Sequence, residues 1–397
     1  MSEVFKGNFT QQEPIPEAGI TAALEVLRSG RLHRYNTAPG ETAETALLEQ
    51  EFAAYTGAKY CLAVASGGYA LATALRAVGV EPGEPVLTNA FTLAPVPGAI
   101  ASIGARPVFV ETTENLTIDL DDLVAKAAHA RVLMLSHMRG HLADMDALMD
   151  IARAHDLIVI EDCAHTMGGA WRGRPSGRHG AIGCYSCQTY KHINAGEGGL
   201  LVTDDAEIAA KSILLSGSYM LYERHLAAPP PEAFADLKYD MPNISGRMDN
   251  LRAAILRPQL ADLAAQVERW NARYRALDAG LAHTPGLTLT TRPTEELIVG
   301  SSFQFLLLDW AGAAVRDVVA RCAARGVELK WFGASDPAAF TSRYAHWHYA
   351  DAAPMPATDR ILAGILDMRV PLTFSIEDCA QIARIIRAEV SAVHQAA

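Results

Sequence analysis

The stretch RVLMLSHMRGHLADMDALMDIARAHDLIVIED (131–162) decides the fold class. It begins with the apolar run RVLMLS (131–136) and ends with the apolar run LIVIED (157–162), and between them DMDALMDIARAHD (144–156) has the spacing of an amphipathic helix. A strand, a helix and a second strand in this order are typical of a parallel sheet that is covered by helices. The segment therefore predicts an α/β fold.

The same alternation continues on both sides of this unit. Further strands are predicted at 60–65, 85–89 and 106–111, with helices at 69–79 and 93–104. Toward the C-terminus, a long helical pattern at 250–282 leads into a shorter mixture of strand and helix patterns. We therefore expect a three-layer large domain with a mostly parallel central sheet over residues 14–250 and a smaller C-terminal α+β domain over residues 251–397.

Composition and charge argue against several classes of protein. Lys and Arg number 34 against 45 Asp and Glu, and a net charge of −11 has the wrong sign for binding nucleic acid. The longest apolar runs fall far short of the roughly 20 residues that a membrane span needs, and the first residues lack the pattern of a signal peptide. Six scattered cysteines suit a reducing compartment. We expect a cytoplasmic protein without a nucleic-acid or membrane partner.

A single lysine lies in a polar, glycine-rich setting within YSCQTYKHINAGEGGLLVTDD (185–205). Most lysines lie on solvated faces, and that interpretation remains open for Lys191. A lysine at the end of a strand can instead be held in a cavity, where desolvation lowers the pKa of the amine and makes it nucleophilic toward a carbonyl. Lys191 is therefore a candidate Schiff-base residue.

Two further features are expected at the same edge of the sheet. Asp162 ends a buried-type strand, so its carboxylate either pairs with a pyridinium nitrogen or caps the next turn. The Ser-Gly-Gly turn at 66–68 stands between a strand and a helix, where backbone amides and the helix dipole favour a phosphate, although glycines also supply ordinary turns. With Lys191, the three features occur in the order expected if all of them serve one pyridoxal phosphate.

The sequence resembles a known family at these positions, the DegT/DnrJ/EryC1/StrS sugar aminotransferases, which are fold type I pyridoxal-phosphate enzymes. The resemblance extends from about residue 14 to near residue 390 and rests on motifs that occur in order. These motifs are SGRL (29–32), LEQEFAAYTGAKYCLAVASGGYALATALRAVGVEPGEPVLTNAFT (48–92), GARPVFVE (104–111), GHLADMDALMDIARAHDLIVIEDCAHTMGG (140–169), IGCYSCQTYKHINAGEGGLLVTDD (182–205) and RMDNLRAAILRPQL (247–260).

The resemblance implies an aminotransferase that uses pyridoxal phosphate. Its donor would be glutamate or glutamine, and its acceptor a keto-sugar, a nucleotide-linked keto-sugar or a cyclitol, in the biosynthesis of an antibiotic or a cell-surface glycan. By resemblance, Lys191 bonds to the cofactor and moves a proton, Asp162 pairs with the pyridine nitrogen, and His165 lies beside the ring. The phosphate would be bound by Ser66, Gly67, Gly68 and Ser186.

The resemblance also implies a homodimer with its active site at the subunit interface. In the family, an asparagine before the Arg-Met motif completes the neighbouring subunit's site, and either Asn243 or Ser245 can fill that place here. Two positions depart from the usual family pattern. Gly68 stands where the family has a threonine, and Leu93 stands where it has an aromatic residue that stacks on the cofactor ring.

Substrate contacts are expected from polar and aromatic residues in loops. The candidates are Arg34, Tyr35, Arg139, His192 and Arg247, with His141 as a further residue near the substrate.

The rival functions are each disfavoured by a specific residue or spacing. Sugar dehydratases of the family replace the lysine with histidine, and a non-catalytic regulatory member would be expected to lose the lysine or the acid; Lys191 and Asp162 are both retained. A dinucleotide enzyme would need a G-x-G-x-x-G turn, which SGGYAL lacks. The Cys pair in CYSC (184–187) has no second pair, so we expect no metal site.

Overall fold

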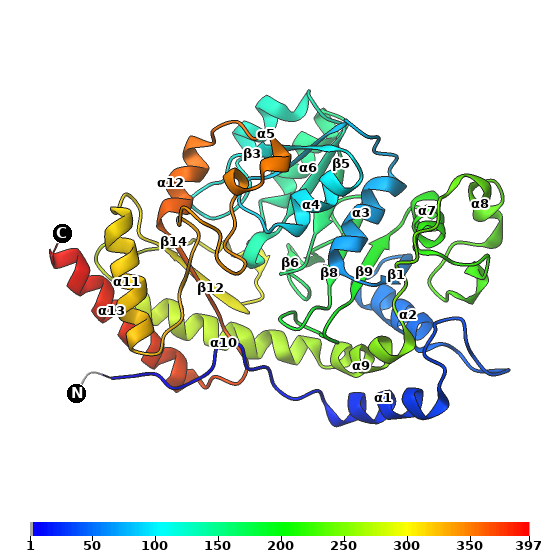
Figure 1. Cartoon of the computed structure of the whole chain (residues 1–397), viewed down its shortest axis with the longest axis horizontal. Coiled ribbons are helices and arrows are strands. Elements are labelled where there is room, and N and C mark those ends of the chain that lie inside the picture. The colour runs from blue at the N-terminus through cyan, green and yellow to red at the C-terminus, as the bar shows by residue number, and fades with distance from the viewer. Residues whose placement is uncertain (1–2, 397) are drawn as a thin grey trace.

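The computed structural model describes residues 3–396, and a seven-stranded sheet with helices on both faces lies at its centre (Figure 1). The strand order is β1-β9-β8-β5-β4-β2-β3. Neighbouring strands from β8 to β3 are parallel, and β9 is antiparallel to both β1 and β8. The bounds are β1 Tyr60–Val64, β2 Pro85–Asn89, β3 Arg106–Val110, β4 Val132–Ser136, β5 Ile158–Asp162, β8 Ile182–Ser186 and β9 Gly199–Thr203.

The two faces of the sheet have separate hydrophobic cores, because successive strand residues point to opposite sides. In β4, Val132 and Met134 pack with helices α3, α4 and α7 on one face. Leu133 and Leu135 pack with α5 and α6 on the other face. The predicted three-layer α/β fold is therefore confirmed. The helices of this unit are α1 Glu17–Ser29, α2 Glu44–Thr56, α3 Gly67–Ala77, α4 Pro95–Ser102, α5 Leu120–Ala127, α6 Met145–Ala154, α7 Ala206–Ser216, α8 Leu237–Asp240 and α9 Asn250–Ala261.

A smaller unit is built around a four-stranded antiparallel sheet in the order β10-β12-β14-β13. The N-terminal segment also belongs to its core, since Phe5 and Phe9 pack edge-on against Phe374. Its elements are α10 Leu263–Leu281, β10 Thr288–Leu289, β12 Ser302–Leu306, α11 Gly312–Ala324, β13 Lys330–Trp331, α12 Pro356–Gly364, β14 Ile365–Arg369 and α13 Ile376–Ala396. A short ribbon of β6 Ala170–Trp171, β7 Arg174–Pro175 and β11 Glu296–Leu297 joins the two units.

The long helix predicted at 250–282 is interrupted at Asp262, which separates α9 from α10. Helix α9 packs against α1 and α2 of the large unit, whereas α10 packs against α13 of the small one. Figure 1 shows the two helices following one another along one side of the molecule, beneath both units. We therefore propose that the division between the units lies at Asp262 and not at the predicted boundary after residue 250.

The sheet brings the expected site residues to one edge. Ser136 at the end of β4 is in register with Asp162 at the end of β5, and Asp162 is in register with Cys184 of β8. The turn at 66–68 follows β1, which also ends at this edge. Among residues 3–396, no helix has both the length and the apolar character needed to cross a membrane.

Candidate active site

A cavity of about 360 Å³ opens at this edge of the large sheet. Its volume lies at the lower end of the range for small-molecule sites. It is lined by the turn of Ser66, Gly67 and Gly68 and by the polar residues Ser136, Asp162, His165, Ser186, Gln188, Lys191 and Glu197, and the apolar wall includes Leu71, Leu93, Pro95, Val96 and Met138. The structure thus brings together the predicted lysine, acid, histidine and Ser-Gly-Gly turn.

One end of the cavity is formed by the N-terminus of α3. Ser66 caps the helix, because its side chain accepts a hydrogen bond from the backbone N–H of Tyr69 at 3.1 Å. Gly67 passes close to Ser186, and a Cβ atom added at Gly67 would lie 2.9 Å from the Cβ atom of Ser186. The first N–H groups of a helix have no partner within it, and together with the dipole they favour an anion. Two serine side chains and free amides therefore meet at this end.

Asp162 also lines the cavity, and its two oxygens have different partners. Oδ2 accepts a hydrogen bond from the hydroxyl of Ser136 at 3.0 Å, and Oδ1 accepts one from the backbone N–H of Ala164 at 3.1 Å. Asp162 therefore caps the next turn and also lines the cavity, so both of its expected roles are compatible. Burial raises the pKa of Asp162, against the bond from Ala164, the charge of Lys191 and the bond from Ser136.

Lys191 and His165 face one another in the cavity. The Nζ atom of Lys191 lies 2.9 Å from Nε2 of His165. Burial lowers the pKa of Lys191 to about 7, against the opposing charge of Asp162. Burial also lowers the pKa of His165 well below its ordinary value, assisted by the charge of Lys191. Lys191 is thus a desolvated amine of the kind that attacks carbonyl groups.

The residues of the cavity fit pyridoxal phosphate. The helix terminus and the serine pair match a phosphate, and the carboxylate of Asp162 matches a protonated ring nitrogen. Lys191 provides an amine with a lowered pKa beside that carboxylate. Leu93 lines the wall at the position where the resemblance implies an aromatic residue, and the one aromatic ring among the residues that line this cavity is the imidazole of His165.

Ser136 is a site residue that the sequence analysis missed. Its hydroxyl contacts Asp162, and the Thr92 hydroxyl lies 2.8 Å from it in turn. Asn89 fixes the backbone of Ser136 through two hydrogen bonds of 3.0 Å. The only sequence signal for Ser136 is its position at the end of an apolar strand, next to the strand that carries Asp162.

Arg34 and Tyr35 were expected near the substrate, and the structure places both elsewhere. Arg34 makes two hydrogen bonds, of 2.8 and 2.9 Å, to the fully buried carboxylate of Glu49. His225 lies 3.0 Å from the same carboxylate and 2.7 Å from the Tyr35 hydroxyl. This buried network joins the 31–36 loop to α2, and neither Arg34 nor Tyr35 lines the cavity.

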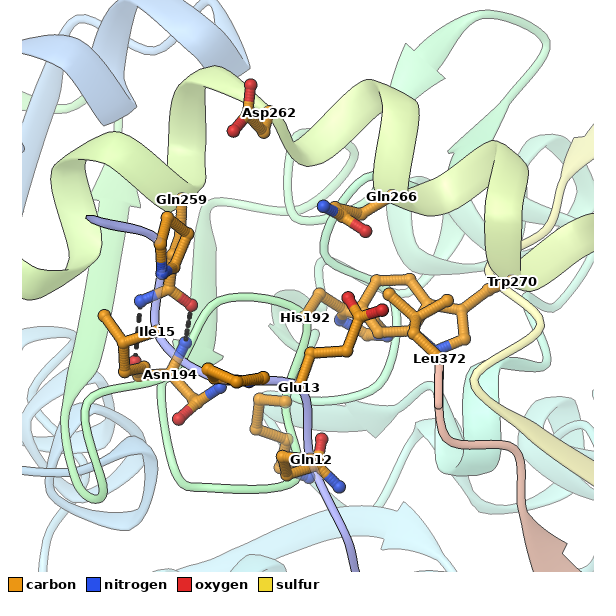
Figure 2. Close-up of a pocket in the computed structure, with 13 residues that line it drawn as sticks. Gln12, Glu13, Ile15, His192, Asn194, Gln259, Asp262, Gln266, Trp270 and Leu372 are labelled. Atoms are coloured by element: carbon orange, nitrogen blue, oxygen red, sulfur yellow. Dashed lines mark hydrogen bonds between the residues drawn. The ribbon is translucent and has the colours of Figure 1, made fainter. Parts of the chain in front are cut away.

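His192 and Arg247 also lie outside the cavity. Figure 2 shows His192 beside Trp270, in a hollow of about 70 Å³ that the segment from Gln12 to Pro16 also borders. Its Nε2 atom lies 3.0 Å from the Ser301 hydroxyl. Arg247 donates to the carbonyl of Gly217 at 2.8 Å and packs over the ring of Tyr219.

Asn243 and Ser245 lie on the exposed surface and do not line the cavity of their own chain. The side chain of Asn243 accepts a hydrogen bond from the backbone N–H of Ser245 at 2.9 Å. The segment that follows them runs beside the phosphate end, because the N–H of Ala65 donates to the carbonyl of Gly246.

Arg139 is the one predicted substrate residue that reaches the site, and it lines a second cavity that adjoins the first.

His141, four residues from His137, is buried and lies 2.8 Å from the side chain of Gln304, away from both cavities. The cysteines of CYSC are free, and they pack in different hydrophobic clusters, Cys184 in one and Cys187 in the other.

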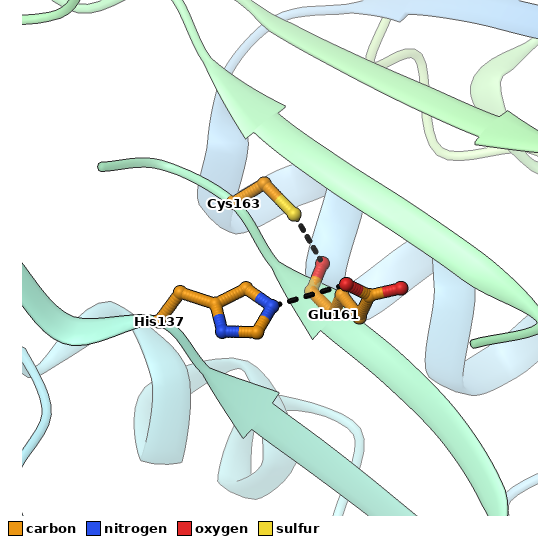
Figure 3. A group of neighbouring side chains, drawn as sticks. All are labelled: His137, Glu161 and Cys163. Atoms are coloured by element: carbon orange, nitrogen blue, oxygen red, sulfur yellow. Dashed lines mark hydrogen bonds and ion pairs between the residues drawn. The ribbon is translucent and has the colours of Figure 1, made fainter. Parts of the chain in front are cut away.

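His137, Glu161 and Cys163 form a buried group with possible metal ligands (Figure 3). The carboxylate of Glu161 is already used, because it accepts hydrogen bonds from the backbone N–H groups of Gly177, His179 and Gly180 and lies 3.0 Å from Nε2 of His137. Burial raises the pKa of the Cys163 thiol well above its ordinary value, which disfavours the thiolate that binds metals. The group anchors the 177–180 turn beneath the site.

Comparison with known proteins gives consistent matches. The DegT/DnrJ/EryC1/StrS aminotransferase family model matches residues 15–387. The L-glutamine:scyllo-inosose aminotransferase of Streptomyces griseus is 34% identical over 285 residues, which are 70% of this chain and 65% of that protein. A putative L-glutamine:3-amino-2,3-dideoxy-scyllo-inosose aminotransferase of Streptoalloteichus tenebrarius is 30% identical over 344 residues, 82% of this chain and 79% of that protein.

Solved structures show the same fold over nearly the whole chain. The crystal structure of 3-amino-5-hydroxybenzoic acid synthase superimposes with a TM-score of 0.82 at 26% identity, and it covers 97% of this chain and 99% of that one.

Proposed function

The chain belongs to the DegT/DnrJ/EryC1/StrS aminotransferase family, and we propose that it uses pyridoxal phosphate to transfer an amino group from glutamate or glutamine to a keto-sugar, a nucleotide-linked keto-sugar or a keto-cyclitol. The observation that carries this proposal is the shared cavity of Lys191, Asp162 and the Ser66 turn. An amine with a lowered pKa, a buried carboxylate and an anion site at a helix terminus are what this cofactor requires.

The residues of the chain would hold the cofactor at three points. Ser66, Gly67 and Ser186 would bind its phosphate, Asp162 its ring nitrogen, and Lys191 its aldehyde carbon through a covalent bond. When bound, the cofactor supplies an electron sink for the negative charge that develops on the carbon bearing the transferred amine. The Ser136 hydroxyl donates a hydrogen bond to Asp162 and so favours the charged form of the acid, the form that would keep the ring nitrogen protonated.

Lys191 is placed to move the proton that amino transfer requires. Its pKa of about 7 means that near neutral pH the Nζ atom both accepts and releases a proton readily. His165 contacts Nζ directly and can orient it. The retained lysine also favours amino transfer over the dehydration reaction of family members that carry histidine there.

The acceptor class is proposed from the relatives. The Streptomyces griseus and Streptoalloteichus tenebrarius proteins are named for keto-cyclitols, and a Streptomyces venezuelae relative, 35% identical over 278 residues, is named dTDP-3-amino-3,4,6-trideoxy-alpha-D-glucose transaminase. These names support a keto-cyclitol or keto-sugar acceptor, in antibiotic or cell-surface glycan biosynthesis. The free, buried cysteines suit a reducing compartment and support a cytoplasmic location.

We further propose that the active form is a homodimer. Asn243 lies on the surface beside the phosphate end, and large apolar side chains are exposed in the 219–244 segment that leads to it. Exposed apolar side chains in such number favour a protein partner. The exposed side chains are Tyr219, Met220, Leu226, Tyr239 and Ile244. A second copy seated here would place Asn243 against its partner's cavity.

The reaction is tested with L-glutamine or L-glutamate that carries an isotope label on the α-amino group, and with a panel of keto-cyclitols and keto-sugars. Labelled amino product from the wild-type protein, and none from Lys191→Ala, is the expected result. Failure of the wild type to release a keto acid from any donor would contradict the proposal.

The dimer is tested by mixing inactive variants. Lys191→Ala and Asn243→Ala lose activity separately, and a mixed dimer regains one site with both residues intact. Absence of recovery in a confirmed mixed dimer would contradict a shared site.

A further inference from the structure

We propose that Arg369 binds the α-carboxylate of the amino donor, in a pocket that adjoins the cofactor cavity; this inference rests on the proposed function. The pocket, which we call the donor pocket, has a volume of about 210 Å³. It shares residues with the cofactor cavity, and the shared residues are Leu93, His165, Gln188 and Lys191. A ligand in the donor pocket therefore has direct access to the Lys191 amine.

The wall of the donor pocket carries more positive than negative charge. Arg139 and Arg369 both line it. Arg139 is almost fully buried, and it forms an ion pair with Asp367, which is fully buried and also accepts a hydrogen bond of 2.6 Å from Gln304. Asp367 thus neutralises Arg139, and the described residues include no ion pair between Asp367 and Arg369.

Arg369 is the cation that remains without a counter-ion. Within residues 3–396, its guanidinium makes no ion pair and donates no hydrogen bond, and its contacts are with aromatic rings. Burial lowers the pKa of Arg369 below its usual value, and the charge of Arg139 lowers it further. A half-buried cation without a counter-ion is stabilised when an anion enters the pocket and pairs with it. The Nε atom of Arg139 is likewise buried without an acceptor among the described residues.

The position of Arg369 suits a planar anion. It is the last residue of β14 and lies opposite Ser302 of β12, so the small sheet fixes its backbone. The guanidinium carbon lies 3.7 Å from the ring centre of Tyr190 and 5.3 Å from that of Phe340. Stacking on a ring face holds the guanidinium plane and leaves its N–H edge available. That edge matches a carboxylate through two parallel hydrogen bonds.

The donor supplies such a carboxylate in the right place. In an α-amino acid, the amine and the carboxylate are attached to the same carbon, so a carboxylate on Arg369 would direct the amine toward the Lys191 side of the same small pocket. A keto-cyclitol has no anionic group for Arg369 to bind. A nucleotide-linked sugar has phosphates, and the experiment must therefore separate these two sources of negative charge.

Binding is measured first, without turnover. The probe is maleate, a dicarboxylate that has no amine, titrated by calorimetry into the protein loaded with pyridoxal phosphate. Removal of a charged hydrogen-bonding partner predicts that Arg369→Gln weakens maleate binding by about 10- to 100-fold, with Arg369→Lys between it and the wild type. The matched control is Arg316→Gln, because Arg316 also packs over an aromatic ring, that of Trp331, but lies outside the pocket. Maleate affinity should be unchanged in the control.

Kinetics then distinguish donor from acceptor. Arg369→Gln should raise KM for the amino donor by about 10-fold or more and leave KM for the keto acceptor unchanged. A rise in KM for the acceptor alone, or inorganic phosphate that competes for the site more strongly than maleate, would overturn the proposal in favour of a phosphate. Unchanged maleate binding in Arg369→Gln would also overturn it. If the proposed function fails, the wild type itself transfers no amino group, whereas failure of this inference leaves that transfer intact.

Discussion

The Nε2 atom of His165 lies 2.9 Å from the Nζ atom of Lys191, while Nδ1 of the same ring lies 3.4 Å from the backbone nitrogen of Arg139, whose N–H donates to it. Because Nδ1 is the acceptor, the proton of the neutral imidazole is on Nε2, which then donates to the lysine amine. Such a bond needs an uncharged amine. The geometry therefore agrees with the lowered pKa values of both groups.

The first prediction concerns the pH at which Lys191 becomes reactive. Burial lowers the pKa of Lys191 to about 7 from an ordinary 10.5, and the neutral amine is the nucleophile. The rate of covalent attachment of pyridoxal phosphate to the cofactor-free protein should therefore rise with pH through a midpoint of about 7. Rapid-mixing absorbance measures this rate, and a midpoint near 10 would show that the amine is not desolvated.

A second prediction concerns the bond from Ser136 to Asp162. Its loss in Ser136→Ala removes a donor to the charged carboxylate, so the pKa of Asp162 should rise. When the pH is lowered, the variant should therefore lose amino transfer at a pH about 1 to 2 units above that of the wild type, which is the shift expected for one hydrogen bond to a charged group. The measurement is the pH profile of the donor reaction.

The control for Ser136→Ala is Thr88→Val on the neighbouring strand β2. The Thr88 hydroxyl is buried and has no partner among the described residues. Removal of the Thr88 hydroxyl should leave the acid side of the pH profile of the donor reaction unchanged. An equal shift in both variants would indicate a general disturbance of the sheet edge.

A third prediction uses two adjacent glycines of the phosphate turn. A Cβ atom at Gly67 would lie 2.9 Å from Ser186, closer than side-chain carbons approach, whereas one at Gly68 would meet only Pro95 at 3.9 Å. Gly67→Ala should weaken the binding of pyridoxal phosphate by at least about 10-fold, and Gly68→Ala should have little effect. Equilibrium dialysis tests this, and equal losses in the two variants would argue against phosphate binding at the turn.

A fourth prediction concerns stability at the buried network of Arg34. Burial alone would raise the pKa of Glu49, but the charges of Arg34 and His225 and their hydrogen bonds lower it to about 2. Arg34→Met leaves this carboxylate buried without its main partner and should reduce the free energy of unfolding by about 3–5 kcal/mol. Urea unfolding at pH 7 measures the loss.

The pH dependence of that loss has a definite sign. A carboxyl group whose pKa is lowered on folding stabilises the protein above its unfolded pKa, and the contribution disappears as the pH falls through the folded value. The difference between wild type and Arg34→Met should thus be largest above about pH 4.5 and shrink toward pH 2. The exposed pair of Arg31 and Glu41 is the control, and Arg31→Met should reduce the free energy of unfolding much less than Arg34→Met does, because solvent screens an exposed ion pair. Similar costs for the two variants would contradict the network's role.

The sheet and the centre of the site were predictable from the sequence because their signals are local. Apolar runs marked β1 to β5 to within one residue at each end. Parallel strands place their carboxyl ends at one edge of a sheet, so the sequence alone predicts that the turn at 66–68, Asp162 and Lys191 meet there.

The environments of the loop residues were not predictable, because they depend on distant residues. Arg34 and Tyr35 are residue types that are common in ligand sites, but their polar groups bind Glu49 and His225 instead. His225 lies 191 positions from Arg34 in the chain, so this contact has no local sequence signal. Arg369 ends the strand ILDMR (365–369), whose apolar and charged residues do not alternate clearly. The break at Asp262 was missed because helical periodicity continues across it.

The central claim is that Lys191 bonds covalently to pyridoxal phosphate in the cavity, and borohydride reduction tests it most directly. The protein is incubated with the cofactor, reduced, digested and examined by peptide mass spectrometry, with Lys191→Arg as the control. The account predicts one modified peptide that carries the cofactor on Lys191, and none at the equivalent position of the control. Cofactor spread over surface lysines, or equal labelling of the control, would contradict it.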